Sequence, residues 1–324
     1  MKAVSVALFA YNRPKHLSNC IESLRKNSES SLTTVYFFLD GPFNTDDIPH
    51  VEQVYEIASS TTGFLEIRIS KRDQHIGLSR NIIDGITQVL AKQESVIVVE
   101  DDLVVSQGFL RYMNRALDFY RESPQVFSIS AYNYPPKILR IPRDYRYDAF
   151  FVMRHMCWGW GTWRDRWAKA DWNLDNYASL RNDESWKRSF QEVGIDLLGM
   201  LNAQMHGEID SWAIRWTHAH FTHHAVCLVP VESLVNNMGA DGSGVHATPT
   251  SRYFHQRLNG KSRSLRLPSL VYVDPLIARV YKTAERRSFF VRATSKVAKV
   301  LSHRGSLINR RQSPAPSAKA KVTR

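Results

Sequence analysis

The sequence predicts an α/β protein built on a doubly wound, mostly parallel sheet. Within the first 125 residues, short apolar runs alternate four times with segments of helical spacing, which is typical of βα units in a parallel sheet. The run at 95–99 is continuously apolar after its first residue, as strands are when both faces of a sheet are covered. The 324 residues suffice for one large domain or two small ones with a substantial core.

The four strand–helix units follow one another directly. We expect strands at 4–10, 35–39, 65–69 and 95–99, and helices at 15–26, 47–59, 78–92 and 107–121. Sheets of this kind bind ligands at the carboxyl ends of their strands. Three of the four strands end in polar clusters, which are Asn12 with Arg13, Asp40, and Glu100-Asp101-Asp102.

The second half of the chain is less regular. We expect strands at 126–130, 149–153 and 226–231, and helices at 180–203 and 210–222. All eight tryptophans lie between Trp158 and Trp216, and a glycine-rich loop occupies 236–246. We therefore expect one domain to about residue 260, with halves at 1–125 and 126–260.

The basic character of the chain is concentrated at its end. The formal net charge is +12, and residues 276–324 contain 13 Lys or Arg and one acidic residue, Glu285, a balance of +12. The remaining body is therefore close to neutral. A neutral body argues against a duplex-binding face, so no specific nucleic acid is expected as a partner.

The basic tail at 276–324 has two interpretations. Residues 277–301 alternate apolar and basic side chains at roughly helical spacing, which suits a basic amphipathic helix on an anionic membrane surface. The alternative is a surface helix followed by a disordered end, because 312–317 are linker-like.

The expected location is cytoplasmic, with peripheral attachment to the inner face of the membrane if the tail binds lipid. Cys20, Cys157 and Cys227 are far apart and form no CxxC pair, which suits a reduced compartment. The first apolar run is too short for a signal peptide, and no stretch of 18 apolar residues occurs.

The acidic run Glu100-Asp101-Asp102 carries the strongest chemical signal. Three carboxylates at the end of a buried strand repel one another and lose solvation, so they call for a compensating cation. Oxygen ligands in this arrangement suit Mg²⁺ or Mn²⁺, which also takes phosphate oxygens and can neutralise a leaving diphosphate. The alternative is a solvated acidic turn.

Together these segments resemble the GT-A glycosyltransferases, in particular the N-acetylglucosaminyltransferase I-like and family 2-like enzymes. The resemblance is carried by VALFAYNRP at 6–14, FFLDG at 37–41, DQHIGLSRNI at 73–82 and VVEDDL at 98–103, and it covers about residues 4–250. It implies a GT-A, Rossmann-like fold with a nucleotide-sugar-binding half and a smaller acceptor half. It also implies metal-assisted, inverting transfer of a hexosyl or N-acetylhexosaminyl group. The donor would be a nucleoside-diphosphate sugar, UDP-linked by preference, and the acceptor a glycan, polysaccharide or lipid-linked molecule.

The resemblance also implies roles on the donor side. Asp102 would ligate the metal, while Glu100 and Asp101 would contact the ribose or support the site. The residues that would line the nucleotide pocket are Asn12, Arg13, Asp40 and His75. The alternatives are a helix-capping turn at 12–13, a turn residue at 40 and an ordinary loop histidine at 75.

On the acceptor side the resemblance points to the segments 157–163 and 207–212. Glycines there allow close backbone approach, and tryptophan rings offer flat faces for sugars. Trp158 or Trp160 would contact the acceptor, with core packing as the alternative. Asp210 would be the general base and Glu208 the second choice. The alternative for Asp210 is a helix N-cap.

The glycine-rich loop completes the expected site. A loop of this kind after a strand can fold over a diphosphate, and the resemblance places His246 on the metal or diphosphate; the alternative is a mobile surface loop. Two other functions remain open. One is a nucleotidyltransferase that makes a nucleotide sugar, although the loop at 10–14 lacks the glycines usual there. The other is a non-catalytic protein that binds nucleotides or nucleic acid.

Overall fold

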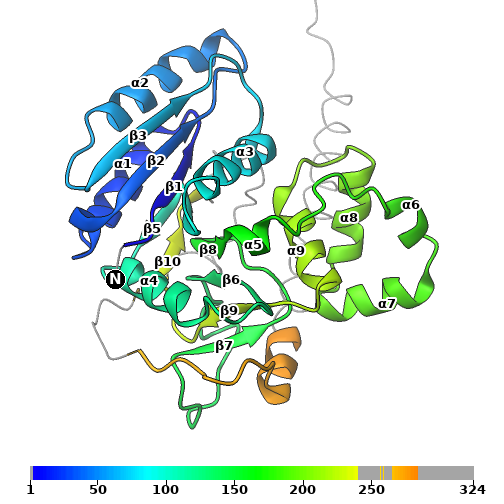
Figure 1. Cartoon of the computed structure of the whole chain (residues 1–324). Helices are drawn as coiled ribbons and strands as arrows, with labels where there is room; N and C mark the ends of the chain where they lie inside the picture. The colour runs from blue at the N-terminus through cyan, green and yellow to red at the C-terminus, as the bar shows by residue number, and fades with distance from the viewer. Residues whose placement is uncertain (1–2, 240–255, 257, 259–264, 284–324) are drawn as a thin grey trace, which may run out of the picture.

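The computed structural model describes residues 3–239, 256, 258 and 265–283, and its centre is an eight-stranded sheet (Figure 1). The strand order is β3-β2-β1-β4-β8-β6-β9-β7. The strands are β1 Val6–Ala10, β2 Thr34–Leu39, β3 Glu66–Lys71, β4 Ser95–Glu100, β6 Val126–Ser130, β7 Ala149–Val152, β8 Trp160–Trp163 and β9 Val226–Pro230. The expected α/β sheet is confirmed.

Most of the sheet is parallel. β1 pairs in parallel with β2 and β4, β2 with β3, and β6 with β9. β8 is antiparallel to both β4 and β6, and β7 is antiparallel to β9. We did not expect a strand at 160–163, which inserts between β4 and β6 and joins the two halves of the chain into one sheet.

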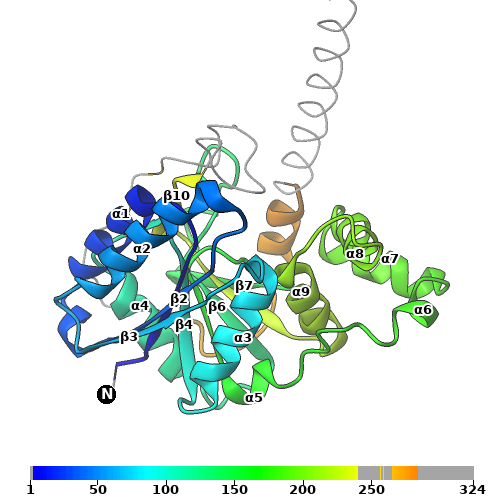
Figure 2. The same cartoon turned by 90° about the horizontal axis from the view of Figure 1, so that it is seen from above.

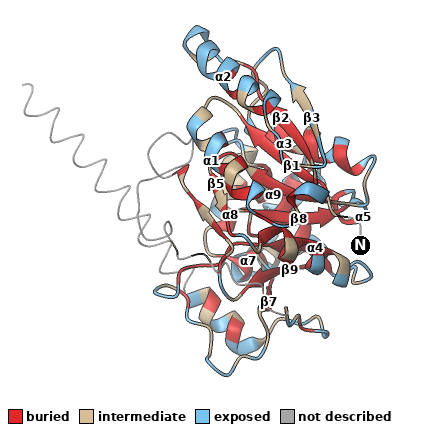
Figure 3. Ribbon diagram, turned by 90° about the vertical axis from the view of Figure 1, so that its left-hand side faces the viewer, coloured by how far each residue is buried: buried red, intermediate tan, exposed pale blue. Residues whose placement is uncertain are grey.

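Helices cover both faces of the sheet. They are α1 Pro14–Arg25, α2 Ile48–Ser59, α3 Leu78–Leu90, α4 Phe109–Phe119, α5 Arg164–Trp167, α6 Tyr177–Leu180, α7 Glu184–Val193, α8 Leu197–Met205 and α9 Trp212–Thr222. Along β1, Val6 and Leu8 pack with α1, α2 and α4, while Ala7 and Phe9 pack with α3 and α9. Successive side chains of a strand face opposite sides of the sheet, so the central strands are buried on both faces (Figure 3).

Helices α6 to α8 form a small lobe beside α9 (Figures 1 and 2). Its own apolar cluster includes Phe190, Leu197, Leu201 and Ile214. The expectation of one helix over 180–203 is wrong, because the chain leaves the helix at Gly194. A β-carbon on Gly194 would lie 2.6 Å from Nη1 of Arg154, so a larger residue there would have to displace the end of that side chain.

The start of the expected tail packs on the body. Residues 275–283 are helical, and Ile277 and Tyr281 are buried. The Tyr281 hydroxyl lies 2.8 Å from Sδ of Met156 and donates to it. Residues 284–324 lie outside the described part of the chain. Among the described helices, none has the length and apolar content needed to cross a bilayer.

Candidate active site

The acidic run lies at the carboxyl end of β4, in the middle of the sheet. Glu100 is the last residue of β4 and pairs with Phe9 of β1. The Asp101 amide donates to the Phe9 carbonyl at 3.0 Å, and the Asp101 side chain is buried. Asp102 is more open, with its side chain 13% exposed. The pairing of β4 with β1 therefore brings the acidic run to the loop that follows β1.

Arg13, in that loop, forms ion pairs with two of the three carboxylates. Its Nη2 contacts Oδ1 of Asp101, and its Nη1 lies 3.2 Å from Oδ2 of Asp102. Burial opposes the charge on Arg13, but the carboxylates outweigh it and raise the pKa of the guanidinium. The side chain thus neutralises part of the acidic run. Arg13 is the N-cap residue of α1, but its side chain makes no capping bond to the helix.

Negative charge remains in excess at this site. Burial, followed by the charges of Asp102 and Asp101, raises the pKa of Glu100 to about 8. Burial also raises the pKa of Asp101 to about 6, against the opposing charge of Arg13. One guanidinium therefore does not compensate three carboxylates, and the site favours a proton or another cation.

Without divalent cations, we expect the melting temperature to fall by about 2–4 °C between about pH 6.5 and pH 8, a shift that roughly 1 kcal/mol produces in a larger domain. Glu100 titrates near 4.5 when unperturbed and near 8 when folded, so in this window only the folded state holds the proton. Burial lowers the pKa values of His155, His218 and His220, which act in the opposite direction but only below about 6.5.

Calorimetry of wild type and Glu100→Gln in the presence of a chelator tests this expectation. The variant carries no titratable group at position 100, so its melting temperature should stay level across the same window. An equal decline in both proteins would assign the pH dependence to other groups.

The short sheet of β5 (Leu103–Val105) and β10 (Val235–Asn237) brings a second segment to Asp102. The Met238 amide donates to the Asp102 carbonyl at 2.7 Å, and Nδ2 of Asn237 lies 3.5 Å from Oδ1 of Asp102. Gly239 donates its amide to Oδ1 of Asn237 at 2.8 Å. A β-carbon on Gly239 would lie 2.4 Å from Oδ2 of Asp102, so only glycine allows this approach.

Gly239→Ala is expected to weaken metal-dependent donor binding about tenfold, a loss of about 1.4 kcal/mol. The added methyl group would push the Asp102 carboxylate out of position. Titration calorimetry measures the affinity, with Gly199→Ala as control because no atom lies within 4 Å of that β-carbon. Equal affinities of the Gly239→Ala variant and wild type would show that the close approach has no role in binding.

Asp40 ties the loop after β2 to the loop after β3. Its Oδ1 accepts the amides of Gly41 and Ile76, both at 2.9 Å, and its Oδ2 accepts the Gly77 amide at 3.1 Å. Nδ1 of His75 lies 2.9 Å from the same Oδ2. The carboxylate is buried and fixes the position of His75 through its own contact with the ring and through the two backbone amides that follow it.

An aromatic cluster stands beside Asp40. The ring of His75 lies 4.8 Å from that of Tyr11 and 5.6 Å from that of Phe43, between ring centroids. Asp47 holds the loop in place, because the Tyr11 hydroxyl donates to its Oδ2 at 2.6 Å and Nδ2 of Asn12 donates to its Oδ1 at 2.7 Å. Phe43 is 74% exposed, so the cluster presents an open apolar face.

The two acceptor-side tryptophans differ in exposure. Trp160 is fully buried in β8 and stacks on Trp212 with 5.2 Å between ring centroids, which places it in the core. Trp158 is only partly buried and meets the ring of Tyr132 edge to face at 4.5 Å. Burial and the charge of Glu100 raise the pKa of the neighbouring Cys157 to about 12. The segment before β8 therefore lies near the acidic run.

Asp210 precedes α9 and has a side chain that is 60% exposed. The N-cap of α9 is Ser211, whose hydroxyl accepts the Ile214 amide, so Asp210 does not cap the helix. A β-carbon on Gly77 would lie 3.6 Å from Oδ2 of Asp210, which brings this carboxylate to the loop held by Asp40. Nη2 of Arg215 lies 3.4 Å from its Oδ1. Glu208 is 67% exposed and lies 3.8 Å from Nδ1 of His206.

The sequence can now be compared with known families. The model of a family described as glycosyl transferase family 2 matches residues 5–180, which is more than half of the chain. The chain belongs to glycosyl transferase family 2. The matched region runs from β1 through the acidic run to α6, and this confirms the expected family and its GT-A type of α/β fold.

More distant similarities exist among solved structures. The family 2 chain is similar to TarS from S. aureus, with 18% identity over 39% of this chain and 21% of that one and a TM-score of 0.29. It is also similar to the mannosyltransferase PcManGT from Pyrobaculum calidifontis, solved with GDP-Man and Mn²⁺. For that structure the identity is 12% over 51% of this chain and 46% of that one, with a TM-score of 0.35. The chain thus matches less than half the length of either protein. No curated protein matches its sequence.

The acidic run of this family 2 chain fits a divalent cation. The raised pKa values of Glu100 and Asp101 show an excess of negative charge beside an accessible Asp102. Within the described ranges, no group of three or more His, Cys, Asp or Glu side chains forms a ready metal cage. One or two carboxylates are enough for Mg²⁺ or Mn²⁺ when substrate phosphates complete the shell. His246 lies outside the described residues.

Several residues at this edge were missed by the sequence reasoning. Tyr11 and Phe43 contribute to the aromatic cluster, and Asn237 and Gly239 contact Asp102. Tyr11 lies in a loop already singled out, so its position after the strand was an available signal. Asn237 reaches Asp102 through three-residue strands, which are too short to show a periodic pattern.

Proposed function

We propose that this chain transfers a sugar from a nucleoside-diphosphate sugar to a hydroxyl group of a glycan, polysaccharide or lipid-linked acceptor, with inversion at the anomeric carbon. The observation that supports this most directly is the grouping of two features at the carboxyl ends of β1, β2 and β4 in a family 2 chain. They are the acidic run, whose Asp102 is closely approached by Gly239, and the aromatic cluster. That edge is where such sheets bind nucleotides.

The donor would lie across the ends of these strands. The base would stack on the rings of Tyr11, Phe43 and His75, because the cluster is open on one side. UDP is the proposed nucleotide, on the family resemblance of the 73–82 segment. Asn12 and Asp40 would shape the pocket by holding its loops, as their contacts to Asp47 and to the 76–77 amides indicate.

The diphosphate would lie over Asp102. A Mn²⁺ or Mg²⁺ ion bound there supplies charge neutralisation for the leaving nucleoside diphosphate. Asp102 would hold the ion, while Glu100 and Asp101 support the site from the buried side. Arg13 would keep Asp101 and Asp102 in place through its two ion pairs. The described contacts of Asn237 and Gly239 restrict Asp102 from the other side.

Asp210 is the proposed general base, and Trp158 the proposed acceptor contact. Asp210 would accept the proton of the acceptor hydroxyl as its oxygen bonds to the anomeric carbon. The bond from that carbon to the phosphate oxygen breaks in the same step, and the nucleoside diphosphate leaves. The exposed position of Asp210 beside Gly77 suits this role, because an acceptor must reach the base from solvent.

A panel of nucleotide sugars, assayed for binding and slow hydrolysis with and without Mn²⁺, tests the proposal. We expect one class of donor to bind only with metal. Failure of every donor under every metal condition would contradict it. Release of pyrophosphate from a nucleoside triphosphate and a sugar phosphate would indicate a nucleotidyltransferase instead. NMR of the product's anomeric centre tests inversion.

A further inference from the structure

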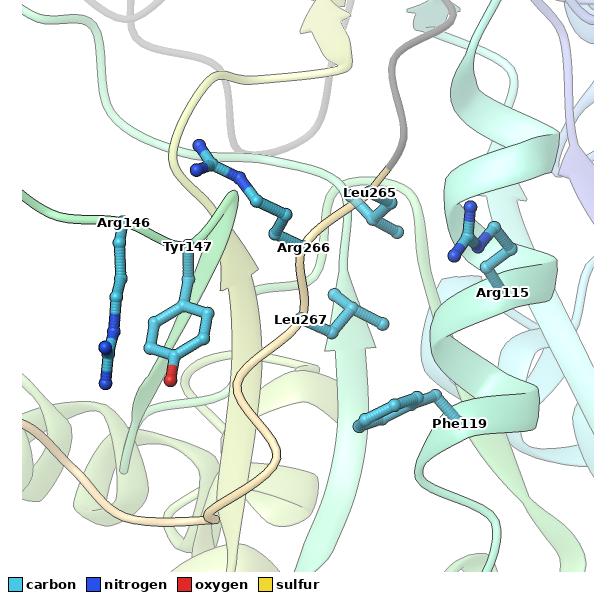
Figure 4. Close-up of a pocket in the computed structure, with 7 residues that line it drawn as sticks. All are labelled: Arg115, Phe119, Arg146, Tyr147, Leu265, Arg266 and Leu267. Atoms are coloured by element: carbon cyan, nitrogen blue, oxygen red, sulfur yellow. The ribbon is translucent and has the colours of Figure 1, made fainter.

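A groove of about 480 Å³ lies between α4 and the segment 265–267 (Figure 4). None of its lining side chains belongs to the candidate active site. Three of them are apolar and three are arginines. The apolar members are Phe119, Leu265 and Leu267, and the arginines are Arg115, Arg146 and Arg266. Figure 4 shows the apolar side chains between Arg115 at one end and Arg146 at the other.

Positive charge at the groove is only partly balanced. Nε of Arg266 lies 3.7 Å from Oδ2 of Asp148. Arg146 stacks over Tyr147, with its Cζ 5.1 Å from the ring centroid. Arg115 and Arg146 are exposed, and neither has a carboxylate within ion-pair distance among the described residues. The rim therefore carries more positive charge than its own protein contacts neutralise.

Large apolar side chains are also exposed along the chain that continues from the groove. Leu270 is 68% exposed and Leu276 57%, and Phe119 in the groove is 51% exposed. The backbone that carries Leu270 and Leu276 is anchored to the body on both sides. The Tyr120 hydroxyl donates to the Pro268 carbonyl at 2.7 Å, and the helix at 275–283 is anchored by its buried residues.

The backbone of this segment is also paired with the chain before β7. The Arg266 amide donates to Oδ2 of Asp148 at 2.7 Å, and the Asp148 amide donates to the Arg266 carbonyl at 2.9 Å. The segment, which begins the orange part of the chain in Figure 1, is thus fixed to the body just before the exposed Leu270. Several large apolar side chains exposed on a fixed part of the surface are typical of an interaction site.

We propose that the groove and the exposed apolar side chains at 270–276 form a docking face for an anionic phospholipid surface. Arginines would pair with lipid phosphates, while Phe119, Leu270 and Leu276 would enter the boundary between headgroups and acyl chains. The aliphatic side chains favour lipid over a polyanionic glycan, because a glycan offers them no apolar phase. This face belongs to the folded body and is separate from residues 284–324.

Vesicle co-sedimentation of the full chain tests the charge contribution. Vesicles of phosphatidylcholine alone are compared with vesicles in which part of the phosphatidylcholine is replaced by the anionic lipid phosphatidylglycerol. We expect Arg146→Glu to weaken binding to the anionic vesicles about tenfold or more. The matched control is Arg80→Glu, which makes the same change of charge on α3, at a side chain that is 73% exposed. The control should bind within about twofold of wild type.

A second pair of variants tests the apolar contribution. Leu270→Ser should weaken vesicle binding at physiological salt, while Leu32→Ser, at a 60% exposed leucine elsewhere on the body, should not. Equal losses in Arg146→Glu and Arg80→Glu would overturn the proposal, because net charge alone would then explain binding. So would unchanged vesicle binding of Arg146→Glu accompanied by lost binding to polygalacturonate, which would identify a glycan site.

Discussion

Asp102→Ala is expected to abolish both sugar transfer and metal-dependent donor binding. The Asp102 side chain is more exposed than that of Asp101, and two segments approach it, through Arg13 on one side and Gly239 on the other. Its loss would remove the ligand proposed to hold the cation against the donor diphosphate. A cation that neutralises the charge on a leaving group stabilises the transition state by several kcal/mol. Activity should therefore fall by about 10³-fold or more.

The measurement separates binding from folding. Mn²⁺ titrations followed by electron paramagnetic resonance report metal affinity directly, in the presence and absence of a nucleoside diphosphate. The melting temperature in chelator should change little, because Arg13 keeps its ion pair with the buried Asp101.

Asp118→Ala is the control for Asp102→Ala. Asp118 is a carboxylate on α4 that forms an ion pair with Arg121 at 2.7 Å, away from the acidic run. Its loss should leave metal affinity and transfer unchanged. Normal Mn²⁺ affinity in Asp102→Ala would show that the cation is held by other groups, and the donor site would then have to be sought elsewhere.

The first half of the chain, residues 1–125, was largely predictable because three of its strands, β1, β2 and β4, are buried on both faces. A strand such as β4 shows its burial as an apolar run, and its polar end shows where a ligand can bind. The ion pair of Arg13 with Asp101 could not be read in this way, since it joins residues 88 positions apart through the pairing of β1 with β4.

The second half of the chain was harder to predict because tryptophans can serve two physical purposes. An aromatic ring can stack on a sugar or fill a core, and both uses allow the same spacing in sequence. Trp160 lies in the core because β8 is inserted into the sheet, where its ring meets Trp212. β8 itself has four residues, two of them large aromatics, and no run long enough to distinguish a strand from a binding loop.

Asp210→Asn is expected to reduce kcat by about 10²- to 10⁴-fold while leaving donor binding intact. The amide has the shape of the carboxylate but does not accept a proton at neutral pH. Because the Ser211 side chain caps α9, the helix should keep its N-terminus in the variant. Asp210 makes one surface ion pair, with Arg215 at 3.4 Å, and the loss of such a pair costs little stability.

Steady-state kinetics with saturating acceptor, combined with donor titrations, distinguish the base from a binding residue. Loss of a general base lowers kcat and removes the acidic limb of the pH–rate profile. Loss of a residue that only holds the donor raises the Kd for the donor instead. Glu208→Gln is the matched control, since Glu208 lies two positions away and is similarly exposed. A large loss in Glu208→Gln with normal turnover in Asp210→Asn would exchange the two roles. Normal turnover in both would place the base outside the segment before α9. Asp210, beside Gly77, could then contact the acceptor but would not accept its proton.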